Sequence, residues 1–164
     1  MRGLVLAALV ALLGSTAHAE EPRRILLSFG WDDLKGYRER SPVLGIDYDF
    51  RPIGTSGRWK WRAGAQVFTD GDLWAGVGVS YSRPVFKGDW FFTASFGPGL
   101  YYRDNERPGV KHLHYPMFRT DGGLGRILES GATVSVILSH LSDGGLDEPA
   151  GSTETLLVRY GRPF

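Results

Sequence analysis

Strand-length segments in which apolar and polar residues alternate follow one another through almost the whole chain. The pattern is clearest from Arg58 to Val67, where tryptophan, alanine and valine fill the odd positions and arginine, lysine, glycine and glutamine fill the even ones. Because successive side chains of a strand point to opposite faces of a sheet, such a segment has one apolar and one polar face. Helical periodicity is hard to find in the same stretches, so the alternation predicts an all-β protein.

Turn signals divide the chain into segments close to the ~9 to 11 residues that a tilted transmembrane strand requires. The eight segments are 25–33, 42–51, 58–68, 73–82, 89–102, 113–125, 131–142 and 152–164. Aromatic residues gather near the ends of the apolar faces, as they do at the membrane interfaces of barrels; they are Tyr48, Phe50, Trp59, Trp61, Tyr81, Trp90, Tyr160 and Phe164. A soluble barrel or sandwich is the alternative, but the aromatic residues favour an eight-stranded antiparallel transmembrane β-barrel of the outer membrane.

The first nineteen residues have the features of a secretory signal peptide. Arg2 gives a positive start, Gly3 to Leu13 form an apolar core too short to span a bilayer, and Ala17-His18-Ala19 resembles a cleavage site. We therefore expect residues 1–19 to be removed, residues 20–164 to form one barrel domain, and the protein to lie in the outer membrane of a Gram-negative bacterium. With an even number of strands, both ends of the mature chain face the periplasm.

Composition excludes several other classes of protein. The chain has no cysteine, which rules out disulfides and thiolate metal sites. Its 19 Lys and Arg residues nearly balance 18 Asp and Glu residues, so a nucleic-acid partner is not expected.

Charged residues on the polar faces of the second and third segments suggest salt bridges inside the barrel. With a short turn near Gly54-Thr55, Asp49 falls opposite Lys60 and Asp47 opposite Arg62. Catalytic carboxylates at Asp47 and Asp49 are the alternative, which the basic neighbours disfavour.

The last two segments place three reactive side chains on one face. His140 and Ser142 continue the otherwise apolar even positions that begin at Ala132, and Glu154 shares a face with apolar residues of the next segment. A hairpin centred on Asp147 sets His140 opposite Glu154, with their Cβ atoms about 4.5 to 5.5 Å apart. Nucleophile, base and orienting acid then converge, as activation of a serine requires. The alternative is that they are polar interface residues, which cost only ~0 to 1 kcal/mol near the membrane surface.

A serine exposed to the outer leaflet on the outside of a barrel meets the acyl esters of lipids, chiefly lipopolysaccharide. Basic residues of the outer loops either bind lipid A phosphates or form solvated loops; they are Lys35, Arg38, Arg40, Arg103, Arg107 and Lys111. His112 and His114 share a face but lack nearby committed ligands, so we expect no metal site.

The stretch SHLSDGGLDEPAGSTE from Ser139 to Glu154, followed by LLVRYGRPF, resembles the C-terminal signature of the PagL family of lipid A 3-O-deacylases, which are eight-stranded outer-membrane barrels. The resemblance implies that Ser142 attacks the ester at the 3-position of lipid A, that His140 takes its proton and that Glu154 holds the imidazole. It also implies lipopolysaccharide as substrate and no metal or other cofactor.

Two positions depart from the family pattern. Asp143 stands where the family usually has asparagine, and Ala150 where a second asparagine is common. An ionised carboxylate cannot donate a hydrogen bond to an oxyanion, so we expect Asp143 to oppose the oxyanion and the N–H groups of Gly144 and Gly145 to remain as donors. A non-catalytic barrel, structural or lipopolysaccharide-binding, is therefore an alternative, and so is a phospholipase. The sequence is compatible with both a homodimer and a monomer.

Overall fold

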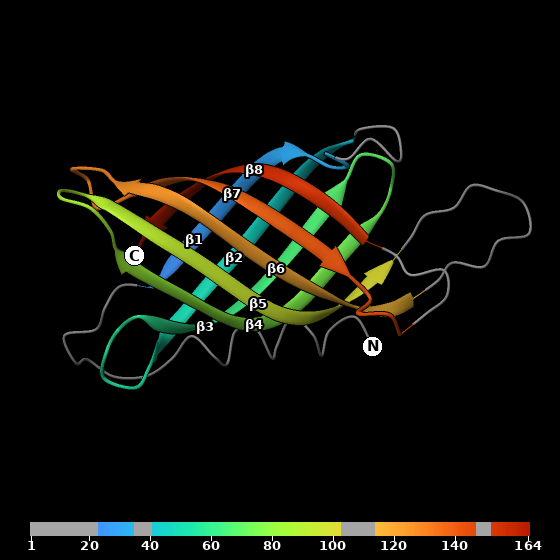
Figure 1. The fold of residues 1–164 in the computed structure, drawn as a ribbon, viewed down its shortest axis with the longest axis horizontal. Helices are drawn as coiled ribbons and strands as arrows, with labels where there is room; N and C mark the ends of the chain where they lie inside the picture. The colour runs from blue at the N-terminus through green and yellow to red at the C-terminus, as the bar shows by residue number, and fades with distance from the viewer. Residues whose placement is uncertain (1–22, 35–40, 103–113, 147–151) are drawn as a thin grey trace, which may run out of the picture.

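The computed structural model describes residues 23–34, 41–102, 114–146 and 152–164, which form a closed barrel (Figure 1). Each strand pairs antiparallel with the next, and the last pairs with the first. The strands are β1 (Arg24–Trp31), β2 (Pro42–Ile53), β3 (Trp59–Phe68), β4 (Leu73–Pro84), β5 (Trp90–Tyr102), β6 (His114–Ile127), β7 (Thr133–Ser142) and β8 (Ser152–Pro163). The predicted eight-stranded antiparallel barrel is confirmed, whereas the predicted signal peptide lies outside the described residues.

The barrel has two distinct ends. We call the end on the left in Figure 1 the inner end, after the side of the membrane that the sequence predicts for it; it holds the C-terminus and the turns that join β2 to β3, β4 to β5 and β6 to β7. The outer end, on the right, holds the last residues of β7 and the first residues of β8. This arrangement places the ends of the strands that carry His140, Ser142 and Glu154 together.

The outside of the barrel is apolar. In β1, Ile25, Leu27 and Phe29 are exposed whereas Leu26 and Ser28 are buried in the lumen. Aromatic side chains gather at the inner end, where Trp59 lies 4.8 Å from Tyr81 and Tyr48 lies 5.8 Å from Phe164, measured between ring centroids. An apolar outer surface with an aromatic girdle suits a barrel surrounded by lipid. Among the described residues, no helix is long and apolar enough to cross a membrane.

Apolar side chains fill the outer half of the lumen. We call this group the apolar plug; its buried members are Val43, Phe68, Trp74, Tyr101, Met117, Ile137, Leu141 and Leu157. Polar atoms within the plug have partners, since the Tyr101 hydroxyl donates to Asp72 at 2.5 Å and the Trp74 indole N–H donates to the Met117 carbonyl at 3.3 Å. The lumen is therefore a packed core at this end.

Below the plug, three arginines and three aspartates form a buried charge network. Arg62 binds Asp49 through two hydrogen bonds of 2.6 and 3.0 Å. Arg159 contacts Asp47 at 3.2 Å and Asp121 at 2.8 Å, and Arg119 pairs with Asp47. Asp121 also accepts hydrogen bonds from Ser95 and Ser139. Each charge of the network faces an opposite charge, which offsets the cost of burial in the lumen, although Arg62 Nη1 and Arg119 Nη1 have no hydrogen-bond partner among the described residues.

The predicted lumenal salt bridges exist, but the predicted pairing was wrong. Asp49 lies opposite Arg62, Asp47 lies opposite Gly64, and Lys60 lies opposite Pro52. The main cause is the position of the turn: Ile53 pairs with Trp59 and Pro52 with Lys60, so the hairpin is centred on Ser56 and not between Gly54 and Thr55. The register shift between Asp49 and Pro52 then changes the pairing by one residue. The Asp47 carboxylate occupies the space that a Cβ atom at Gly64 would fill, so it reaches Arg119 and Arg159 instead of Arg62.

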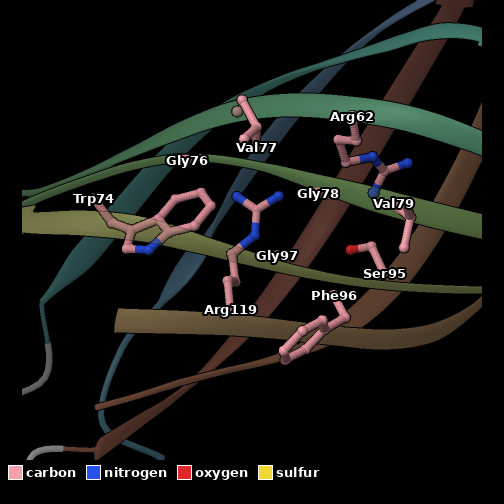
Figure 2. Close-up of a pocket in the computed structure, with 11 residues that line it drawn as sticks. Arg62, Trp74, Gly76, Val77, Gly78, Val79, Ser95, Phe96, Gly97 and Arg119 are labelled. Atoms are coloured by element: carbon pink, nitrogen blue, oxygen red, sulfur yellow. The ribbon is translucent and has the colours of Figure 1, made fainter. Parts of the chain in front are cut away.

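A small cavity lies within this network (Figure 2). Arg119 stacks over the Trp74 ring, with 4.4 Å between the guanidinium carbon and the ring centroid, and Arg62 lies beyond it. The cavity has a volume of about 10 Å³, which holds one water molecule. It is too small for a lipid or any other organic ligand.

Replacing Asp121 by alanine should destabilise the barrel by about 3 to 5 kcal/mol, because breaking a buried ion pair leaves uncompensated charge. Asp121 accepts from Arg159 and Ser139, at 2.8 Å in each case. The measurement is urea unfolding of the protein in lipid vesicles, with Asp89→Ala in the β4–β5 turn as the control. Equal midpoints for Asp121→Ala and wild type would contradict the role given to this network.

Candidate active site

The β7–β8 hairpin brings His140 opposite Glu154, as the sequence predicted. The imidazole Nδ1 lies 3.3 Å from Glu154 Oε1, within ion-pair distance. The His140 side chain is 42% exposed and the Glu154 side chain 15%, so the carboxylate is more sheltered than the ring that it holds. With Nδ1 directed at the carboxylate, Nε2 is the nitrogen left to act as a base.

Ser142 ends β7 on the same outward face as His140. The two residues are separated by two positions on a strand that rises about 3.3 Å per residue, so their side chains are neighbours on that face. Ser142 is half-buried and lies between Phe118 of β6 and Ser152 of β8. Phe118 stacks on Phe96, with 5.9 Å between centroids and 6° between planes, so an apolar aromatic surface borders the serine.

A buried carboxylate at the end of β1 holds the strand on both sides of Glu154. Asp32 Oδ1 accepts hydrogen bonds from the hydroxyls of Thr153 at 2.5 Å and Thr155 at 3.0 Å. These threonines point into the lumen, whereas Glu154 between them points outward. The Leu34 N–H also donates to the Glu154 carbonyl at 3.1 Å. Sequence reasoning missed Asp32, because the link depends on closure of β1 against β8.

The turn after Ser142 has its own hydrogen bonds. Asp143 is 2% exposed, and its Oδ1 accepts a 2.8 Å hydrogen bond from the Gly145 N–H. Gly144 and Gly145 have φ values of +67° and +77°, in the left-handed region that glycine adopts without strain. Burial and this hydrogen bond within the turn argue against the expectation that the Asp143 carboxylate opposes the oxyanion. Because the Gly145 N–H already donates to the Asp143 carboxylate, the Gly144 N–H is the better candidate donor to the oxyanion.

Several predicted contacts fall on parts of the chain beyond the described residues. They are the basic loop residues Lys35, Arg38, Arg40, Arg103, Arg107 and Lys111, together with His112 and Ala150. In the described part of the chain, no group of three or more His, Asp or Glu side chains is arranged to hold a metal ion. None of His140, Ser142 and Glu154 lines either of the two cavities formed by the described residues; they lie on the outward face of the hairpin, where a substrate could meet them.

Comparison with solved structures identifies the fold. The crystal structure of the outer membrane enzyme PagL matches with a TM-score of 0.60 and 20% identity, over 86% of this chain and 99% of that chain. The N-terminal β-barrel domain of Pseudomonas aeruginosa OprF matches with a TM-score of 0.62 and 11% identity, over 87% and 99%. Neisserial surface protein A matches with a TM-score of 0.56 and 8% identity, over 87% and 96%. At these identities the likeness establishes the outer-membrane barrel fold.

Comparison with protein-family models shows to which family the chain is related. No curated protein sequence gives a significant match. The model of the family described as Lipid A 3-O-deacylase (PagL), however, matches residues 26–163, which is nearly the whole barrel. The chain is therefore an outer-membrane β-barrel that belongs to the PagL family of lipid A 3-O-deacylases, which are ester hydrolases.

Proposed function

We propose that this protein removes the ester-linked acyl chain at the 3-position of lipid A, using Ser142, His140 and Glu154 on the outward face of the barrel. The observation that carries the proposal is the 3.3 Å contact between His140 Nδ1 and Glu154 Oε1, with Ser142 beside them on the same face. Membership of the PagL family supplies the substrate class.

Each side chain has one role in the reaction. Ser142 Oγ attacks the ester carbonyl carbon while His140 Nε2 takes the hydroxyl proton, which gives a tetrahedral oxyanion. Collapse of this intermediate breaks the ester bond, and the imidazolium returns its proton to the departing sugar oxygen. Water, activated by the same imidazole, then hydrolyses the acyl-serine. Glu154 keeps the ring oriented and stabilises the imidazolium.

The turn after Ser142 supplies the proposed oxyanion donor. The Gly144 N–H follows the nucleophile closely in the chain, in a backbone conformation that the hydrogen bond from Gly145 to Asp143 fixes. A preorganised N–H of this kind is worth about 10² to 10³ in rate when it faces the oxyanion.

The position of the site suits a lipid substrate. His140 and Ser142 lie at the outer end of β7, and below them the same face carries Leu138 and Val136, which are about half exposed. Acyl chains of an outer-leaflet lipid would lie along this apolar surface while the ester stays at the level of Ser142. We retain the basic residues Lys35, Arg38, Arg40, Arg107 and Lys111 as proposed contacts of the lipid A phosphates. A homodimer would leave the arrangement intact, because one chain supplies all three reactive groups.

Mass spectrometry of lipid A tests the function directly. Lipid A from cells that express the protein should lose the mass of one hydroxyacyl chain relative to cells that lack it. Unchanged lipid A would favour the non-catalytic barrel, and release of fatty acid from phospholipid alone would favour the phospholipase.

Replacing Asp143 by asparagine should change kcat by less than about tenfold, well below the 10² to 10³ expected of an oxyanion contact. The asparagine carbonyl can accept the same hydrogen bond from Gly145 N–H, whereas Asp143→Ala removes the acceptor and should lower kcat more. The measurement is the initial rate on purified lipopolysaccharide at equal folded concentration. A hundredfold rise in Asp143→Asn would show instead that the carboxylate opposes the oxyanion.

Asp32 should act as a positioning residue for Glu154. We expect Asp32→Ala to lower kcat by about tenfold with little change in KM, because the Thr153 and Thr155 hydroxyls lose the acceptor that fixes the strand around Glu154. Asp32→Asn keeps an acceptor and should retain most of the activity. Asp72→Ala is the matched control, since Asp72 is also a buried outer-end carboxylate and binds the Tyr101 hydroxyl instead.

A double-mutant cycle separates positioning from general destabilisation. If Asp32 acts through Glu154, Asp32→Ala should have little further effect in a Glu154→Ala background. Independent, multiplicative losses from the two substitutions would assign Asp32 to stability alone.

A further inference from the structure

The inner end of the barrel contains a second, larger cavity that has no part in the proposed reaction. We call it the vestibule; its volume is about 300 Å³, at the lower limit of small-molecule binding sites. It is lined by the starts of β1, β3, β5 and β7, the ends of β4 and β6 and the β2–β3 turn, so it opens at the inner end. The charge network and the apolar plug close it on the side of the outer end.

The wall of the vestibule is strongly cationic. Among the described residues that line it, one carboxylate, Asp49, faces six basic side chains, which are Arg24, Arg58, Lys60, Arg62, Arg83 and Arg159. Asp49 is already bound by Arg62 through two hydrogen bonds, and Arg159 is bound by Asp47 and Asp121 of the charge network. The lining arginines nearer the mouth therefore add positive charge that no carboxylate among the described lining residues offsets.

Neutral hydrogen-bond donors complete the wall. Thr93, Thr133 and Ser135 are buried residues of the lining, and the Thr93 hydroxyl accepts a 3.2 Å hydrogen bond from Ser82, which keeps its own proton available for donation. Arg24 is oriented by a 3.2 Å hydrogen bond from its Nη1 to the Gly131 carbonyl. Because the carbonyl carries no net charge, this hydrogen bond does not neutralise the arginine. A recess with walls of low dielectric and one sign of charge concentrates counter-ions, and guanidinium groups bind phosphate oxygens in pairs.

We propose that the vestibule binds a small phosphate-bearing polyanion of the size of pyrophosphate. Arg58 and Arg83 at the mouth and Arg24 on the wall supply the charge, and the buried hydroxyls donate to the remaining oxygens. The site lies at the opposite end of the barrel from Ser142, so its occupancy is separate from ester hydrolysis.

Calorimetric titration of the folded barrel with pyrophosphate, in a zwitterionic detergent and about 150 mM salt, tests the proposal. We expect saturable binding of one pyrophosphate per barrel, weakened at least about tenfold in the double variant Arg58→Gln, Arg83→Gln. The matched control is Arg126→Gln, Arg162→Gln, which removes the same charge from exposed residues at the same end that are not part of the lining. The control should bind as wild type does, and all variants should hydrolyse lipid A at the wild-type rate.

Two results would overturn the proposal: no saturable binding, or equal weakening in the lining and control pairs, which would show diffuse attraction to a basic surface. Amide NMR of the wild-type protein provides a readout that requires no variant. Pyrophosphate should shift the amide signals of Thr93, Thr133 and Ser135 and leave those of the outer-end strands unchanged; shifts spread over both ends would also refute the site.

An experiment in lipid bilayers distinguishes two possible sources of the phosphate group, a lipid headgroup and a free solute. If the natural ligand is the headgroup of an anionic inner-leaflet lipid, phosphatidylglycerol in nanodiscs should compete with pyrophosphate and lower its apparent affinity for the wild type. If it is a free solute, the affinity in these nanodiscs should match that in zwitterionic ones.

Discussion

Replacing either Ser142 or His140 by alanine should reduce lipid A deacylation by on the order of 10³-fold or more while the barrel stays folded. Nucleophile and base act as a unit, so removing one leaves the other without a function. Both side chains lie on the outward face and neither belongs to the apolar plug or the charge network, so folding should not suffer. The measurement is the initial rate of fatty-acid release, with heat-modifiable gel migration as the check on folding.

The structure provides a close control for the nucleophile. Ser152 lies directly across from Ser142 on β8 and is exposed. Ser152→Ala should therefore keep nearly full activity. If Ser142→Ala retained activity and Ser152→Ala lost it, the nucleophile would be on the wrong strand of the hairpin.

Glu154→Ala should lower kcat by about 10²-fold, less than loss of the nucleophile, because the carboxylate orients and stabilises the imidazole without reacting itself. KM should change little, since the proposed contact of Glu154 is His140 Nδ1 and not the lipid. Steady-state rates over a range of lipopolysaccharide concentrations separate the two parameters.

Glu129→Ala is the corresponding control, because Glu129 is an exposed glutamate in the β6–β7 turn at the inner end. It should match the wild type in both parameters. An effect of Glu154→Ala confined to KM would make Glu154 a substrate contact and would remove it from the triad.

Alternation in the sequence was sufficient to predict the barrel and the face of each reactive residue. Parity along β7 separates Ser142 and His140 from the inward Ser139 and Leu141, and a tight hairpin has few possible registers, so the position of Glu154 followed. The β2–β3 register did not follow, because several glycine, serine and threonine residues could form the turn and the sequence does not mark Ser56 as its centre or the register shift after Asp49.

Contacts between distant parts of the chain could not be predicted from the sequence. The hydrogen bond from Thr153 to Asp32 joins residues 121 positions apart, and it exists because β8 closes on β1. The direction of the Asp143 carboxylate was likewise hidden, since it depends on the left-handed backbone of Gly144 and Gly145. Residue types alone suggested a repelling charge, whereas turn geometry made the same carboxylate a hydrogen-bond acceptor.

The seam between the first and last strands also has a consequence for biogenesis. A nascent chain can form the β7–β8 hairpin early, and with it the approach of His140 to Glu154, because that contact is local. The support from Asp32 arrives only when the two ends of the sheet meet. If Glu154 acts as proposed, the roughly tenfold in rate that we assign to Asp32 is gained only when β1 and β8 pair, so the proposed esterase would reach its full rate only in the closed barrel.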